Sequence, residues 1–159
     1  SCSSNPGSTA FGTLLSSATS TGDNNASTTM ACANSGSGCV LYVQDTNAGL
    51  ATTSPAYLIP SPNAAFNATA TFSAGTEGYG IQATSSAASG SGALFTLGAR
   101  YNQKGNIVGG LASTTSQTLA STSASTTGRE VLITHTASIS ASTPGGSYTD
   151  TITYSCLVQ

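Results

Sequence analysis

Short runs of alternating apolar and polar residues, separated by turn-forming residues, recur along this chain, and no stretch has helical periodicity. The clearest run covers residues 130–141, where Val131, Ile133 and Ala137 share one side with His135. Because side chains in a strand point alternately to opposite sides, this spacing predicts a strand with one buried face. Serine, threonine and glycine, which are weak helix formers, fill the intervals. The chain is therefore predicted to be all-β.

The end of the chain predicts a second amphipathic strand over residues 148–158. Its apolar side would carry Tyr148, Ile152, Tyr154, Cys156 and Val158. We expect this strand to be central to the core. Other short strands are predicted at residues 10–15, 28–33, 39–45, 79–83 and 93–101. Residues 56–59, between two prolines, are predicted to be an edge strand or a loop. About eight to ten strands with frequent turns indicate an antiparallel β-sandwich with long Ser/Thr/Gly-rich loops. No interior boundary is visible, so residues 1–159 are predicted to form one domain.

Charge is scarce in this chain. Three basic and five acidic residues give a formal net charge of −2. Three dispersed cations cannot neutralise a phosphate backbone, which argues against nucleic-acid binding. The apolar runs are far shorter than the roughly 20 residues of a membrane helix, so no membrane insertion is expected. The chain begins at Ser1 without a methionine, which we interpret as a processed mature form.

Four cysteines, Cys2, Cys32, Cys39 and Cys156, predict two disulfides formed outside the cytoplasm. The sequence alone allows three pairings. We favour Cys32–Cys39, across the turn-forming residues 33–38, together with Cys2–Cys156, which would join the chain ends. The rival is Cys2–Cys32 with Cys39–Cys156. A metal site is not predicted, because Cys32 and Cys39 are too far apart for zinc spacing and no second histidine is present.

No catalytic residue is predicted, and we expect that the protein is not an enzyme. The only histidine, His135, falls on an apolar strand face, where a structural role is the simpler interpretation. The chain lacks a Gly-x-Ser-x-Gly nucleophile motif, and no motif indicates a cofactor. Asn25 and Asn67 stand in acceptor sequons for N-glycosylation and are the candidate modification sites.

Three segments resemble a known family. Residues 11–14 (FGTL), 29–32 (TMAC) and 144–154 (PGGSYTDTITY) are similar to the spore coat protein U family, which includes subunits of archaic chaperone–usher pili. The closing motif also resembles the camelysin/TasA-like bacterial surface proteins. The resemblance implies an immunoglobulin-like, pilin-like sandwich that polymerises when an N-terminal strand of one subunit fills a groove in the next. This chain departs from that pattern, because its first ten residues are almost without apolar side chains.

These observations predict a structural subunit of an extracellular or cell-surface filament, whose partners are copies of itself. Strand edges that carry almost no lysine favour strand addition between copies. Residues 1–10 are the first candidate for the connecting segment, because a chain end can reach a neighbour without unravelling its own sheet. The alternative is a monomeric adhesin or carbohydrate-binding module that recognises surface glycans.

Overall fold

The computed structural model describes residues 2–4, 7–21, 27–34, 36–62, 68–87, 90–111 and 115–159. All regular structure in these ranges is β-strand, and every strand pairing is antiparallel. This confirms the all-β, antiparallel prediction. A search of the same ranges finds no helix of sufficient length and hydrophobicity to cross a membrane.

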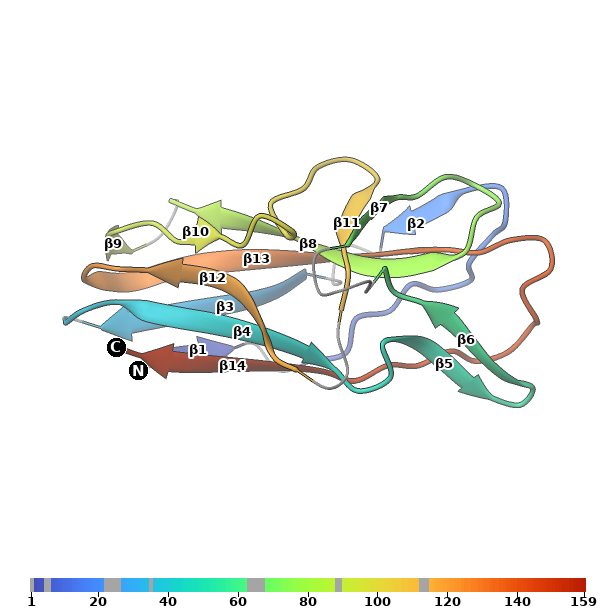
Figure 1. Ribbon diagram of the computed structural model, residues 1–159, viewed down its shortest axis with the longest axis horizontal. Helices are drawn as coiled ribbons and strands as arrows, with labels where there is room; N and C mark the ends of the chain where they lie inside the picture. The colour runs from blue at the N-terminus through green and yellow to red at the C-terminus, as the bar shows by residue number, and fades with distance from the viewer. Residues whose placement is uncertain are drawn as a thin grey trace.

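Two sheets pack against each other in a sandwich-like arrangement (Figure 1). The larger sheet has the order β1 (Cys2–Ser4), β3 (Ser27–Asn34), β13 (Thr126–Ser138), β8 (Gly78–Ser86), β11 (Ile107–Gly109) and β7 (Thr69–Thr71). Two short strands, β2 (Thr19–Thr21) and β9 (Ser91–Gly92), also pair with β13. The smaller sheet has the order β10 (Thr96–Leu97), β12 (Gln117–Thr122), β4 (Cys39–Asp45) and β14 (Ile152–Val158). A separate hairpin joins β5 (Gly49–Thr53) to β6 (Ala56–Pro60).

Strand β13 is the centre of the larger sheet, with β3 on one side and β8 on the other. Val131 and Ile133 are completely buried, whereas Leu132 between them is 38% exposed. Leu41 and Val43 of β4 form the facing layer in the smaller sheet. The alternation predicted over residues 130–141 is thus confirmed as far as His135, but residues 135–138 are all buried and the strand ends at Ser138. The predicted strand at residues 39–45 has the bounds observed for β4.

One predicted strand is absent, and another is much shorter than expected. Residues 10–15 form no strand, and Gly12 in this segment adopts a positive φ of 65°, which interrupts an extended chain. Of the strand predicted at residues 93–101, only β10 is formed. The chain turns immediately afterwards, where the amide of Tyr101 donates to the carbonyl of Gly98. Tyr101 lies in this turn rather than in a strand, and its side chain is buried in the core.

Strand β14 follows the predicted alternation, but it begins at Ile152 rather than at Tyr148 and does not have the predicted position. Ile152, Tyr154 and Cys156 are half-buried, and the residues between them are exposed. Val158, expected on the apolar side, is 41% exposed. The strand lies at the end of the four-stranded sheet beside β4, so the expectation that it is central to the core is wrong. Periodicity reports which side of a strand is apolar, but not whether neighbours flank both its edges.

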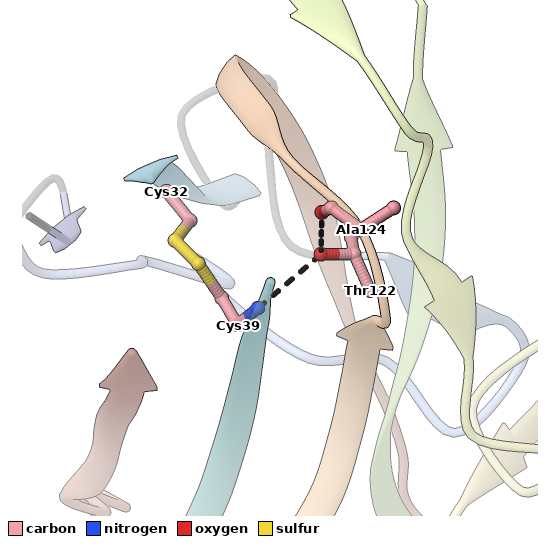
Figure 2. Close-up of a disulfide and its surroundings, with 4 residues drawn as sticks. All are labelled: Cys32, Cys39, Thr122 and Ala124. Carbon is pink, nitrogen blue, oxygen red and sulfur yellow. Dashed lines mark hydrogen bonds between the residues drawn. A yellow bond between two sulfur atoms is a disulfide. The ribbon is translucent and has the colours of Figure 1, made fainter. Parts of the chain in front are cut away.

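The Cys32–Cys39 disulfide is present and joins β3 of the larger sheet to β4 of the smaller one (Figure 2). It therefore links the two layers rather than two strands of one hairpin. The amide of Cys39 donates to Thr122 Oγ1 at 3.2 Å, and the Thr122 hydroxyl donates to the carbonyl of Ala124 at 3.2 Å. The first of these bonds joins the start of β4 to the end of β12.

The second predicted bridge, Cys2–Cys156, involves a side chain that lies outside the described residues. Its backbone surroundings are described: Cys2 is opposite Cys32 in the β1–β3 ladder, and β1 also contacts β14. Cys156 is disulfide-bonded. The Cys2–Cys156 pairing stays a prediction.

Gly38, next to Cys39, is expected to be intolerant of substitution. Its φ is 108°, and a Cβ atom there would collide with the carbonyl oxygen of Thr122. Gly38→Ala should lower the free energy of unfolding by about 2 kcal/mol or more, because both strain and the collision must be relieved. Gly145→Ala is the control, since a Cβ at Gly145 meets no atom within 4 Å. Urea denaturation would compare them, and equal stability of the two variants would contradict this reading.

Candidate functional site

A cleft of about 900 Å³ opens between the N-terminal segment and the segment that leads into β14. Residues 7–14 form one wall and residues 143–152 form the other. Tyr79 and His135 from the larger sheet, together with Leu50 from β5, line its interior. The cleft is therefore mainly aromatic and aliphatic within, with hydroxyl groups along its walls.

Residues 7–15, here called the cover segment, close this side of the sandwich without forming a strand. Phe11 and Leu14 are half-buried and pack against the core. The Phe11 ring meets Tyr79 edge-on, with centroids 6.0 Å apart. Leu15, in contrast, is 57% exposed. Two side chains anchor the cover segment, and no sheet ladder contributes to its attachment.

His135 lies at the base of the cleft and is only 4% exposed. Its Nδ1 is 3.3 Å from the Tyr79 hydroxyl and its Nε2 is 3.4 Å from the Tyr154 hydroxyl. Burial lowers the pKa of His135 to about 4, so the ring is neutral near pH 7. A neutral imidazole has one donor and one acceptor, which the two hydroxyls can match. The geometry gives His135 a structural place in the core.

Glu77 does not line the cleft, but it contacts the cleft wall through Thr143. Its carboxylate accepts hydrogen bonds from the Tyr57 hydroxyl at 2.8 and 2.9 Å, from Ser140 at 3.2 Å, and from Thr143. Burial by itself would raise the pKa of Glu77, but these hydrogen bonds outweigh it and lower the pKa. Tyr57 in turn packs edge-on against Tyr148, with centroids 6.5 Å apart. A single carboxylate therefore joins Tyr57, Ser140 and Thr143 by hydrogen bonds.

A second acidic site lies where Asp45 and Asp150 meet. Asp45 ends β4, and Asp150 lies two residues before β14 in the wall of the cleft. The pKa of Asp150 is raised to about 7, first by burial and then by the neighbouring Asp45 carboxyl. The two residues are far apart in sequence, and neither lies in a recognisable motif, so sequence reasoning missed the pair. Only strand register brings them together.

The other predicted sites are distributed elsewhere. Cys32 and Cys39 join the sheets at the end of the molecule where β14 terminates. Both glycosylation candidates, Asn25 and Asn67, lie outside the described residues. Among the predicted site residues whose side chains the structure describes, only the structural histidine lies in the cleft.

No protein-family model matches this chain, and neither a curated protein nor a solved structure is significantly similar to it. Its function must therefore be inferred from the cleft, the strand edges and the distribution of charge.

Proposed function

We propose that this chain is a non-enzymatic structural subunit of an extracellular homopolymer with an immunoglobulin-like sandwich. Copies would join by exchanging their N-terminal segments. The observation that carries this proposal is the cleft beside β14, one wall of which is the irregular cover segment of the same chain. A strand from a neighbouring copy could replace that segment and extend the sheet.

Exchange of the cover segment between copies would cost little binding energy. Phe11 and Leu14 would make the same core contacts in a neighbour as in their own chain, so only the connection changes. The described N-terminal strand β1 pairs with β3 of its own chain, and it would move together with the cover segment. This assigns the connecting role to residues 1–15, a longer segment than residues 1–10.

Most of the charged side chains in the described part of the chain have contacts within the chain, which favours close packing of copies. Arg129 donates to the carbonyls of Ala87 and Gly92, and Arg100 lies 5.7 Å from the centroid of the Tyr101 ring. Glu77, Asp45 and Asp150 are held as described above. Outward positions of the strands instead expose apolar side chains, such as Leu132 of the central β13 and Leu157 of β14. A surface with little free charge does not repel its own copies.

The test uses substitutions in the cover segment. Negative-stain microscopy of the concentrated wild-type protein should show filaments. Phe11→Asp combined with Leu14→Asp should abolish them, because charged side chains cannot enter the cleft of a neighbour. Leu15→Asp, at the adjacent exposed position, is the control and should leave filaments intact. Circular dichroism would verify that all variants keep their β-structure. Monodisperse wild-type particles at every concentration would overturn the proposal.

The predicted Cys2–Cys156 bridge offers an independent readout of exchange. If the N-terminal segment enters a neighbour, the bridge forms between copies rather than within one. Unreduced protein should then run as a ladder of covalent multimers on a denaturing gel, and reduction should collapse the ladder to one band. Filaments without a ladder would show that copies join by another segment.

Carbohydrate binding by a monomer is the second candidate. The half-buried Tyr148 lies in the cleft wall next to hydroxyl-bearing residues, and an aromatic ring beside hydroxyls is suited to stacking on a sugar. A glycan array would test this function. Binding that is lost in Tyr148→Ala but kept in Leu15→Asp would favour it.

A further inference from the structure

Asp45 and Asp150 each hold one carboxyl oxygen in a fixed set of hydrogen bonds. Oδ1 of the fully buried Asp45 accepts the amides of Asn47 and Ala48 at 2.6 and 2.8 Å. Oδ1 of Asp150 accepts the amide of Thr151 at 2.7 Å and lies 3.4 Å from Nδ2 of Asn47. These bonds fix both carboxyls in place.

The second oxygen of each carboxyl is buried and receives no donor. This applies to Oδ2 of Asp45 and Oδ2 of Asp150. Two ionised carboxylates in this position would repel each other and would lose their hydration without compensation. A single proton shared between them would turn the repulsion into a hydrogen bond, as in other closely spaced carboxyl pairs.

The titratable groups described around the pair supply no positive charge that would offset the repulsion between the two carboxylates. Tyr79 of β8 faces the pair, and its pKa is raised by burial and further by Asp150 and Asp45. Tyr154 of β14 and His135 of β13 lie beyond it, and His135 is neutral near pH 7. Within the described part of the chain, no third acidic, histidine or cysteine ligand joins the two carboxyls to make a metal site.

We propose that Asp45 and Asp150 share one proton near neutral pH, and that the resulting carboxyl–carboxylate hydrogen bond fastens the entry of β14 to the turn after β4. The proton belongs to the pair rather than to one residue. The raised pKa of Asp150 agrees with this arrangement. At alkaline pH the proton is lost, and this wall of the cleft loses its fastening. The proposal does not depend on polymer formation and is tested on dilute monomer.

The pair and His135 make opposite contributions to the pH dependence of stability. The pKa of Asp150 is raised on folding from 3.8 to about 7, so its contribution is present at low pH and is lost as pH rises towards 7. The pKa of His135 is lowered from 6.5 to about 4, so stability is lost as pH falls through this range. Between pH 5 and 8 the two effects partly cancel in the wild-type protein.

Single substitutions should uncover each effect. In Asp150→Asn, an amide replaces the proton-sharing carboxyl, and the midpoint of thermal unfolding should rise by roughly 4–8 °C from pH 5 to pH 8. In His135→Gln only the contribution of Asp150 remains, so the unfolding midpoint should fall from pH 5 to pH 8. The fall should be only a few degrees, because the partial exposure of Asp150 weakens its contribution to stability. Glu130→Gln is the control for removing an acid elsewhere, and its pH profile should match the wild type.

Carbon NMR of the wild-type protein provides a measurement that needs no variant. The Asp150 carboxyl signal should titrate with a midpoint near 7. A midpoint near 4, or an Asp150→Asn profile identical to the wild type, would overturn the proposal. A third outcome would also overturn it: calcium raises the unfolding midpoint at pH 8, the effect is reversed by a chelator, and it requires Asp150. The two carboxyls would then bind a divalent cation rather than share a proton.

Discussion

Ile133→Asp is expected to prevent folding, because it places a charge at the centre of the larger sheet. Ile133 is completely buried, and its strand pairs with β3 on one side and β8 on the other. An aspartate there would lose its hydration without gaining a partner, and the core would lose a large aliphatic side chain. The loss should exceed about 4 kcal/mol, which is a large share of the stability of a domain this size.

The adjacent Leu132→Asp variant is the matched control. Leu132 points to the opposite side of the same strand and is 38% exposed, so the new carboxylate stays in water. We expect a loss of about 1 kcal/mol or less. Far-UV circular dichroism and urea titration would compare the two proteins. Similar damage in both would mean that another layer covers the outer face of β13.

Removal of the Cys2–Cys156 bridge is expected to cost about twice as much stability as removal of Cys32–Cys39. The loop-entropy model gives about 5 kcal/mol for a bridge that closes nearly the whole chain and about 2.5 kcal/mol for one that closes a loop of eight residues. The comparison uses two paired variants, Cys2→Ser/Cys156→Ser and Cys32→Ser/Cys39→Ser. Each pair leaves the other bridge intact.

Thermal unfolding and thiol counting would test this ranking. The unreduced wild-type protein should show no free thiol, and each double variant should also show none. One free thiol in a Cys32→Ser single variant should be located on Cys39, as the observed bridge requires. If the Cys2→Ser/Cys156→Ser variant were as stable as the wild type, the predicted tie between the chain ends would be wrong.

The spacing of apolar residues along the chain was sufficient to predict the class of fold and the buried faces of its clearest strands. Alternation is a local property, because each strand residue points opposite to its neighbour whatever lies beside the strand. For this reason Val131, Ile133 and Ala137 could be assigned to the core, and residues 39–45 could be identified as a strand, from spacing alone. The turn-forming residues 33–38 likewise supported the Cys32–Cys39 bridge.

How these strands are combined depends instead on contacts between distant segments of the chain. The same alternation describes β14, yet its place at the sheet end leaves Ile152 and Tyr154 half-buried. Residues 10–15 of the cover segment were expected to form a strand, but this segment is irregular, and Phe11 and Leu14 pack against the core without it.

The Asp45–Asp150 pair arises because β14 runs antiparallel to β4, which sets Asp45 opposite Ile152 and brings Asp150 close to it. Such a pairing joins residues from distant parts of the chain, and local patterns carry no information about it. The cleft has the same origin, since its walls come from the two ends of the sequence. Local sequence therefore set the strands and their faces, whereas packing between distant segments created the cleft and the carboxyl pair.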